Sequence, residues 1–564
     1  LPKAALASGA LPSFFHPVRY EGRLLIDGGV KNNYPIDEVR AKGMDIIIGI
    51  DVQGDLKTEE EIKSGIDVLL QISDYQVMNN IDKKIKKTDV YISPDIDAYS
   101  VLSFDDGEAI IEAGYTETAT QKNILKEIAS RQKIVVTPNV ILPKNTDRYV
   151  TTIEIEGVTN YSESYILGKL KIDPPTVVTP EDLNDGISNL SATKNFNRID
   201  YTINEQENGN TIIRFDIEES PSKNTLRLSV HYDDLYKTSA LVGFSRKRLL
   251  TDNDNFYFDV IIGDNIRYDL SYFIDRGYRW SFGMNSSFNS FEIDVPASAV
   301  FGSATDETVL NTVALDYRDL THQLYIESIF KRNFLFGGGI EFKSLRQFTE
   351  TISDIESSNQ SRTTFENGNY LSAYTYINYD SYDNAFFPTR GVTFKGDAHW
   401  YLLNSGQNPD FENFLIAQAI MGYASSITDR LSVNTKASSG FKLGDKSTPF
   451  LDFWLGGYGY KSFNNFTPFY GYDVLSVRGN SFVKIESSLN YRLFSKNYLQ
   501  LFGNIGTIGD DIFDNGEWTD LLDLKGVGVG YGLETIIGPI EIKYTHPLID
   551  GSNGVWLISG GYRF

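Results

Sequence analysis

The sequence predicts a multidomain chain with an α/β region, a small αβ module and a C-terminal antiparallel β-barrel that crosses a membrane. Three observations lead to this fold class. The chain has 564 residues, more than one domain usually holds. At about residue 222 the hydropathy pattern changes from mixed strands and helices to one strand after another. No apolar run approaches the ~20 residues of a membrane helix, so a membrane-crossing element must be a strand.

Composition excludes several classes of function. The 75 acidic residues outnumber the 52 basic ones, which gives a net charge of −23 and argues against a nucleic-acid partner. Cys is absent, which excludes disulfides, Cys-ligated zinc and thiol catalysis. The five His residues are scattered without metal-ligand spacing, so nothing points to a metal, although carboxylates alone could build a site, and no cofactor is expected. Because the chain starts at Leu1, we expect a processed or truncated sequence.

Residues 1–131 show an α/β pattern. Short apolar runs at 24–26 and 45–51, bounded by turn residues, are typical of buried strands. A helix is predicted over 58–73, where three Glu residues occupy the first turn and apolar residues then recur at helical spacing. A second helix is predicted over 106–129, since its isoleucines and leucine lie on one side of a helical repeat.

A linker and a small module come next. Residues 132–147 contain two prolines, which favour an extended linker. Thr179 and Pro180 form a helix start, and Asn208-Gly209 is a strong hairpin signal. The module, residues 148–221, is therefore predicted in the order strand, helix, helix, strand, strand, over 149–158, 162–172, 179 onward, 197–204 and 211–218.

Residues 222–564 alternate apolar and polar side chains, for example over 256–262 and 266–272. A soluble β-sandwich would alternate too, so period alone leaves that alternative open. The region is too long for one open sheet, many predicted strands end in aromatic residues, and the chain stops on a strand at Phe564. These features favour a membrane barrel, and the length accommodates sixteen strands of about ten residues.

Four blocks in order carry a family resemblance in the first region. They are A-S-G-A-L-P-S-F-F at 7–15, D-G-G at 27–29 after a predicted strand, N-Y-P at 33–35, and D-V-Y-I-S-P-D at 89–95. Together they resemble the C-terminal half of a patatin-like phospholipase domain. Such enzymes use a Ser–Asp dyad whose Asp lies in a D-G-G or D-G-A turn. The resemblance therefore implies that Asp27 is the catalytic base and that Gly28 and Gly29 form its supporting turn.

The nucleophile of this dyad is not found in the chain. A Ser hydroxyl is a weak nucleophile until an adjacent base takes its proton, so the Asp alone cannot act. The family's Ser lies in G-x-S-x-G on a strand-to-helix elbow. No such motif precedes Asp27, and neither Ser8 nor Ser13 matches it. This chain by itself is therefore expected to be inactive.

The other two regions also resemble known families. The element order of 148–221 resembles a single POTRA module. The block D-N-A-F-F-P-T-R-G at 383–391 is similar to one in BamA-type barrels of the bacterial surface antigen superfamily, most of which have sixteen strands. These barrels carry a V-R-G-F/Y motif on a lumenal loop. We favour Phe469-Tyr470-Gly471-Tyr472 for this motif, and Val477–Asn480, with Arg478, is the alternative.

These resemblances imply a bacterial outer-membrane acyl hydrolase with its patatin and POTRA parts in the periplasm. Its substrate would be a phospholipid ester, attacked by Ser with Asp27 as base. The alternative is a non-catalytic BamA-type barrel that assists insertion or translocation of other proteins. A passive pore would leave the POTRA module without a role. Expected partners are the phospholipid substrate, outer-membrane lipid, and a second copy or other outer-membrane and periplasmic proteins.

Overall fold

The structure is a computed structural model that divides into two compact units, Leu1–Lys144 and Asn145–Phe564, and each is described by itself. It describes all residues except 1, 13–14, 16, most of 53–80, 100–102, 104–105, 132–146, 207–208, 278–279, 302–310, 331–333, 351–362, 407–409, 445–446, 461, 521–522, 536, 549–552 and 563–564. The predicted linker at 132–147 and the predicted helix at 58–73 therefore lie almost entirely outside the described residues. So does Ser13.

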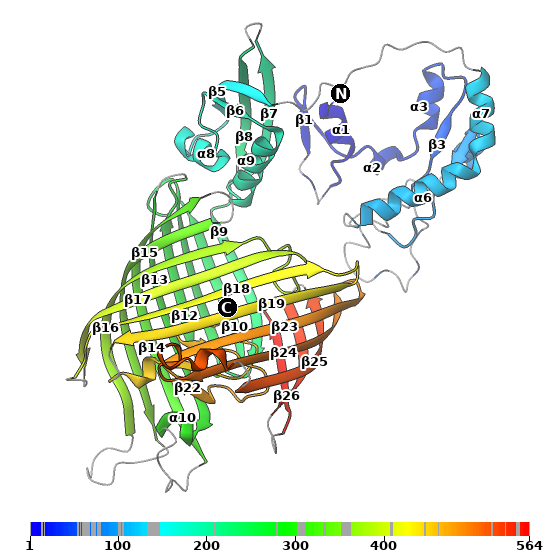
Figure 1. Cartoon of the computed structure of the whole chain (residues 1–564). Coiled ribbons are helices and arrows are strands. Elements are labelled where there is room, and N and C mark those ends of the chain that lie inside the picture. The colour runs from blue at the N-terminus through cyan, green and yellow to red at the C-terminus, as the bar shows by residue number, and fades with distance from the viewer. Residues whose placement is uncertain are drawn as a thin grey trace. The chain divides into compact units, whose positions relative to one another are not determined.

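The first unit contains two small sheets and several helices (Figure 1). In one sheet β1 and β2 are antiparallel, and in the other β3 and β4 are parallel. The bounds of its strands are Val18–Tyr20, Arg23–Leu25, Ile48–Ile50 and Val90–Ile92. Its helices are α1 (Pro2–Ser8), α2 (Gly29–Asn32), α3 (Ile36–Ala41), α5 (Ile81–Ile85), α6 (Gly107–Thr120) and α7 (Lys122–Arg131).

Two local predictions for this unit are wrong. The helix expected over 106–129 is divided into α6 and α7 at Gln121. The strands expected to be buried over 24–26 and 45–51 are largely exposed, Leu24 by 62%, Ile48 by 47% and Ile50 by 58%. Among the described residues β3 pairs only with β4, and its Ile48 and Ile50 are not part of the small core of Tyr34, Ile36 and Ile47.

The second unit begins with a four-stranded sheet in the order β6-β5-β8-β7, packed against two helices. A three-residue strand, β6, lies between the helices and is absent from the sequence prediction. The capping Thr179 and Asp182 exchange hydrogen bonds as a capping box at the start of α9. The elements are β5 (Arg148–Glu156), α8 (Glu163–Leu170), β6 (Thr176–Val178), α9 (Pro180–Ala192), β7 (Phe196–Glu205) and β8 (Thr211–Glu219).

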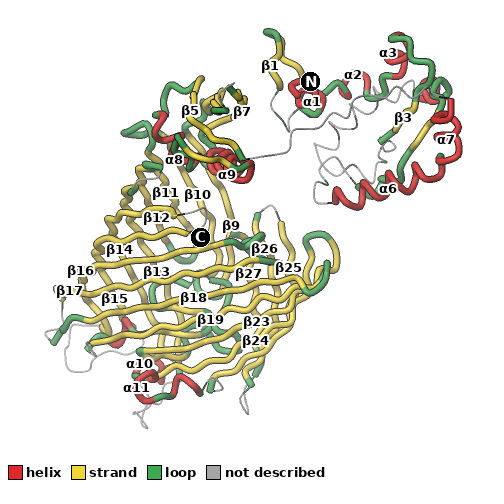
Figure 2. Tube along the Cα trace, turned by 45° about the horizontal axis from the view of Figure 1, so that its top comes forward, coloured by secondary structure: helices red, strands yellow, loops and turns green. Residues whose placement is uncertain are grey.

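Sixteen antiparallel strands then close into a barrel, which confirms the predicted fold class (Figures 1 and 2). β27 pairs with β9 to close the ring. The strands are β9 (Asn224–Asp233), β10 (Lys237–Lys247), β11 (Asp254–Gly263), β12 (Arg267–Ile274), β13 (Ser281–Pro296), β14 (Thr312–Phe330), β15 (Phe334–Thr349), β16 (Thr363–Asp380), β17 (Gly391–Gly406), β18 (Phe414–Ser426), β19 (Leu431–Gly444), β23 (Ser481–Phe494), β24 (Asn497–Gly509), β25 (Leu524–Thr535), β26 (Gly538–Pro547) and β27 (Val555–Gly561). The end of the barrel at which β9 begins, next to the module, is called the near end. The opposite end of the barrel is called the far end.

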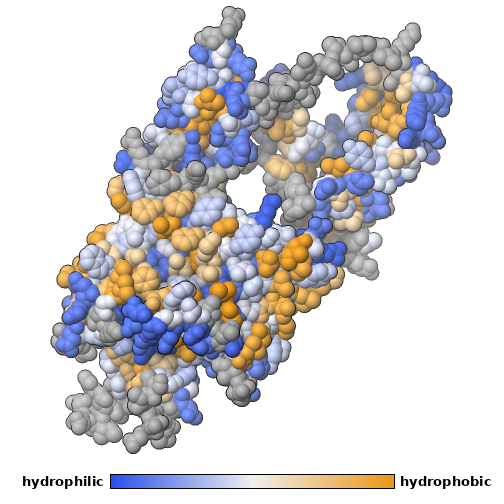
Figure 3. Space-filling model, viewed as in Figure 1, coloured by the Kyte–Doolittle hydropathy of each residue, from blue (hydrophilic) through white to orange (hydrophobic). Residues whose placement is uncertain are grey.

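The barrel places apolar side chains outside and charged ones inside, the reverse of a soluble protein. On β15, Ile340 and Phe342 are 54% and 42% exposed, whereas Glu341 and Lys343 are almost fully buried. Apolar residues also gather over the outer surface of the strands in Figure 3. This pattern suits a lipid-facing wall around a polar lumen and rules against the soluble sandwich. In the part of the chain that the structure describes, no helix has the length and apolarity to cross a membrane.

The connection between β19 and β23 fills the lumen. Its described residues from 447 to 480 form a short 3-10 helix (Pro449–Leu451) and a small sheet of β20 (Phe453–Leu455), β21 (Phe466–Thr467) and β22 (Val477–Gly479). We call this segment the plug. Phe453, Trp454 and Phe466 are at most 1% exposed and pack with aromatic residues of the barrel wall. The plug is thus held in the lumen by a hydrophobic core that it shares with the barrel wall.

The module is joined to near-end turns of the barrel by buried polar contacts. Lys169 on α8 forms a 2.6 Å ion pair with Asp275, beyond β12. Arg248, beyond β10, lies 3.6 Å from Glu219 at the end of β8. Burial disfavours the Glu219 carboxylate, but the Asn160 side chain and the backbone amides of residues 159–161 donate to it and lower its pKa to about 2. The module is therefore positioned by specific pairs.

Candidate functional site: the barrel lumen and the Asp27 turn

Asp27 lies in a turn between β2 and α2. Its backbone amide donates to the Ala10 carbonyl at 3.0 Å, and its carboxylate Oδ1 accepts the Gly29 amide at 2.7 Å. Among the described residues no side chain donates to the carboxylate, so its second oxygen is open to a hydroxyl from elsewhere. The turn can orient a base but contributes no nucleophile of its own.

The two glycines after Asp27 have different roles. A Cβ on Gly29 would lie 2.7 Å from the Asn33 side-chain oxygen and 3.0 Å from the Asp27 carboxylate, so a side chain there would displace one of these groups. Gly28 has ordinary helical angles (φ −65°), and an added Cβ would meet nothing within 4 Å. Of these two glycines, Gly29 is the one at which a side chain would disturb the Asp27 carboxylate.

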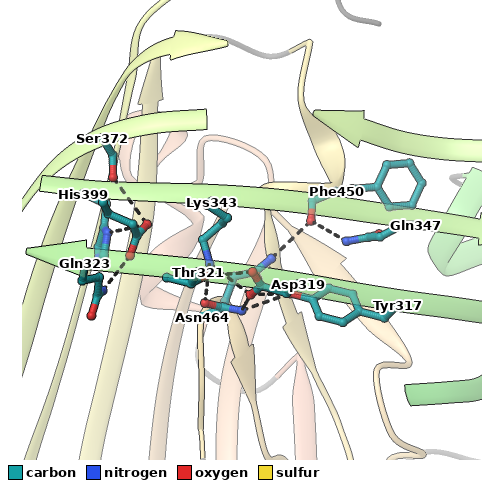
Figure 4. A network of polar contacts seen from close by, with 12 residues as sticks. Tyr317, Asp319, Thr321, Gln323, Lys343, Gln347, Ser372, His399, Phe450 and Asn464 are labelled. Carbon is teal, nitrogen blue, oxygen red and sulfur yellow. Dashed lines mark hydrogen bonds and ion pairs between the residues drawn. The ribbon is translucent and has the colours of Figure 1, made fainter. Parts of the chain in front are cut away.

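Asn464 attaches the plug to one wall of the lumen (Figure 4). Its amide nitrogen donates to Asp319 at 2.6 Å and to the Tyr317 hydroxyl at 3.0 Å. Its amide oxygen accepts the Lys343 ammonium at 2.9 Å. Its backbone carbonyl accepts Gln418 from β18 at 2.9 Å. One plug residue therefore joins β14, β15 and β18.

The charges around Asn464 compensate one another. Lys343 forms 3.1 Å contacts with both the Asp319 carboxylate and the Thr321 hydroxyl. The neighbouring Glu341 accepts Gln323 at 2.7 Å and lies 3.4 Å from His399. Buried ions of this kind are tolerated only when paired and hydrogen-bonded. The network specifies where the plug sits, because a displaced plug would leave Asp319 and Lys343 without their bonds to Asn464.

A second set of contacts joins the plug to the opposite wall. The Tyr458 hydroxyl donates to Glu541 on β26 at 2.6 Å and also contacts Lys543. Gly459 has a positive φ of 96°, and an added Cβ would lie 3.1 Å from the Cβ atoms of both Asp233 on β9 and Ser559 on β27. The plug therefore touches both strands that close the ring.

The structure separates the two candidate lumenal motifs. Tyr470, in the favoured segment Phe469–Tyr472, packs against Phe502 at 4.5 Å between ring centroids, and a Cβ on Gly471 would lie 3.0 Å from Pro547. Arg478, the alternative, lies on β22 with its guanidinium 5.5 Å from the Phe450 and Trp454 rings, both in the plug itself. The first segment contacts the wall of β24 and β26, whereas Arg478 lies against plug rings and donates to the Val300 carbonyl, beyond β13, at 3.4 Å.

Sequence reasoning missed the anchor residues Asp319, Lys343 and Asn464. One signal was present: Glu341 and Lys343 stand at alternate positions of a strand whose other face is apolar, which places charge in the lumen. Nothing local marks Asn464, whose side-chain partners are all more than 100 residues away in the sequence. Among the described residues no cluster of His, Asp and Glu could hold a metal ion.

Comparison with known proteins agrees with this architecture. Residues 211–564 match the OMP85 superfamily, and residues 1–40 match the patatin-like phospholipase family. A lysophospholipase NTE1 from Meyerozyma guilliermondii is 26% identical over 134 residues, which cover 19% of this chain and 9% of that protein. The chain thus corresponds to a small part of that relative.

Among solved structures, BamA from Haemophilus ducreyi lacking POTRA domains 1–3 superimposes with a TM-score of 0.51 at 14% identity, over 74% of this chain and 85% of that one. CdiB from Acinetobacter baumannii gives a TM-score of 0.49 at 13% identity, over 73% of each chain. The first likeness shows a shared fold. Because the family match spans the whole barrel and more than half of the sequence, the chain belongs to the OMP85 superfamily and has the barrel of an outer-membrane protein.

Proposed function

We propose that this chain is the membrane-anchored part of a lipid acyl hydrolase, with the patatin-like fragment and a single POTRA module on the periplasmic side. The observation that carries the proposal is the Asp27 turn, which lies within the patatin-like match and precedes an OMP85 barrel in the same chain. The base would then work beside a membrane, where phospholipid esters are abundant.

The proposed reaction is acyl transfer through a Ser–Asp dyad. A Ser supplied by a segment outside this chain attacks the ester carbonyl while Asp27 takes its hydroxyl proton. The lysolipid alkoxide leaves with that proton, and water then releases the fatty acid from the acyl-enzyme with Asp27 again as base. The bond from the Gly29 amide keeps one carboxylate oxygen fixed, so the other can face the hydroxyl.

Hydrolysis of a fluorogenic phospholipid by the complete protein in detergent tests this proposal. Asp27→Asn should lower the rate by ~10²–10⁴, because the amide keeps the volume but cannot accept the proton. Asp37→Asn is a matched control, since Asp37 is an exposed carboxylate bonded to Lys87. Activity that survives in the Asp27 variant, or loss of the same size in the Asp37 variant, would contradict the assignment.

A second candidate function is supported by the closing seam of the barrel. Among the described residues, β27 and β9 are in register at two pairs, Gly560–Tyr232 and Gly561–His231, whereas β26 and β27 pair along six. Few ladder bonds make this the weakest junction of the wall. A barrel that opens there could pass an extended chain toward the lipid, as insertion or translocation of other proteins would need.

A reversible disulfide separates the two functions. The chain has no Cys, Gly560 has space for a side chain, and directly opposed strand residues lie within disulfide reach. Tyr232→Cys with Gly560→Cys should abolish insertion or translocation when oxidised and restore it on reduction, leaving lipid hydrolysis unchanged. Val242→Cys with Val260→Cys is the control, because it links β10 and β11, which are already paired along their length. This disulfide should leave both functions unchanged. Full transport through the oxidised Tyr232–Gly560 seam would exclude the second function.

A further inference from the structure

The connection between β16 and β17, residues 381–390, contains the F-P-T-R-G block but has no part in the functions above. It is a rigid turn. Asn384 accepts the amides of Phe386 and Phe387 at 2.8 and 3.0 Å. Asp383 accepts the amides of Thr389 and Arg390 at 2.9 and 3.1 Å. Two side-chain-capped turns of this type hold the connection in one shape.

This connection reaches far from its own strands. Phe387 stacks on Tyr498 of β24 with ring centroids 4.3 Å apart and planes 13° apart, and it is 2% exposed. Asn384 donates to Glu534 of β25 at 2.8 Å. In the ring β18, β19 and β23 stand between β17 and β24. The segment therefore crosses part of the near mouth instead of joining its two strands by the shortest path.

Glycine marks the far anchor of the crossing. A Cβ on Gly532 of β25 would lie 2.7 Å from the Phe387 ring, so the ring occupies the space that a side chain would take. Phe386 lies next to Tyr562, just beyond β27, with centroids 5.9 Å apart. The crossing segment thus contacts the wall close to the end of the closing strand.

A cavity lies between this segment and the plug. Its volume is about 460 Å³, and its lining includes Ala385 and Phe386 from the crossing segment, Tyr458 and Tyr470 from the plug, and Lys395 and Ser438 from the wall. Aromatic and charged side chains line it together, and the charged ones suit an aqueous chamber. The plug bounds it toward the far end and the crossing segment toward the near end.

We propose that residues 381–390 form a strap that closes the near mouth of the lumen, with Phe387 and Asn384 as its two attachments. The strap must release Tyr498 and Glu534 before solutes on the near side gain free access to the chamber. The strap is a closure separate from the plug. When the strap opens, solutes from the near side enter the chamber, but the plug still blocks the path across the membrane.

The absence of Cys allows a direct test in the full chain. Ser438→Cys places one thiol in the chamber, at a residue 7% exposed, and a charged, membrane-impermeant methanethiosulfonate measures its access. Phe387→Ala removes a buried ring and should speed the modification at least about tenfold. Phe394→Ala, the same change on the next strand outside the strap, should leave the rate unchanged.

A second variant distinguishes release of the strap from a folding defect. Asn384→Asp keeps an oxygen that accepts the amides of residues 386 and 387, but it places a second carboxylate next to Glu534. Because the two carboxylates repel each other, this variant should also speed the modification of the thiol. Adding Glu534→Gln should restore the slow rate, which a merely weakened turn would not do. Ion conductance in planar bilayers should stay at the unmodified level in all strap variants. Equal modification rates with and without strap variants, no rescue by Glu534→Gln, or a conductance increase in Asn384→Asp would overturn the proposal.

Discussion

Replacing Lys343 with Met should destabilise the barrel and its plug together. The substitution removes the partner of Asp319, whose side chain is 2% exposed, and three hydrogen bonds to Asp319, Thr321 and Asn464. Removing one member of a buried pair costs ~3–5 kcal/mol. Asp319 keeps its bonds from Asn464 and Thr321, so we expect the lower end, about 3 kcal/mol.

The double variant Lys343→Met with Asp319→Asn tests the cause. It removes the uncompensated charge and should recover about 2 kcal/mol of the loss. Urea unfolding of the barrel in lipid vesicles gives each free energy, and single-channel conductance reports whether the plug has left the lumen. Lys395→Met is the control, because Lys395 is a lumenal lysine that lines the cavity between the strap and the plug. It should change the free energy of unfolding by less than ~0.5 kcal/mol. A double variant no more stable than Lys343→Met would refute the reasoning, because the cost would then come from packing alone.

Two further predictions concern the docking of the module. The pKa of Glu219 is lowered from 4.5 to about 2, so its contribution to stability is complete above pH 4.5 and is lost as the pH falls toward 2. Glu219→Gln should remove this pH-dependent loss of stability from the acid-unfolding curve. An acid-unfolding curve that is unchanged in the variant would contradict the prediction. Gly277 has φ +71°, and a Cβ there would lie 3.2 Å from Gly168 of the module, so Gly277→Val should broaden the module-to-barrel distances measured by spin labelling. Gly209→Val has the same backbone strain without the contact and should leave them narrow.

The sequence predicted the class of each region because hydrophobic periodicity is a local property. Alternation in β11 and β12, the capping Thr179 and the overall length predicted a barrel preceded by an αβ module. The number of sixteen strands followed from the resemblance to BamA-type barrels, and the structure confirms it. Local patterns predicted burial less well where the burial of a strand depends on the residues that pack over its face. Ile48 and Ile50 have the composition of a buried strand but are exposed in this unit.

The sequence by itself determined that the strands after about residue 222 alternate as a barrel wall does, and by family resemblance it marked Asp27 as the candidate base and residues 469–472 or 477–480 as the candidate lumenal motif. Only the tertiary structure decided how the lumen is filled. Asn464 meets Lys343 and Asp319, and Phe387 meets Tyr498, across more than 100 residues of sequence each. These pairs depend on the curvature and closure of the ring, which bring together side chains from strands that are not neighbours. No local pattern encodes such a meeting, because each partner alone is an ordinary lumenal polar residue or a turn aromatic.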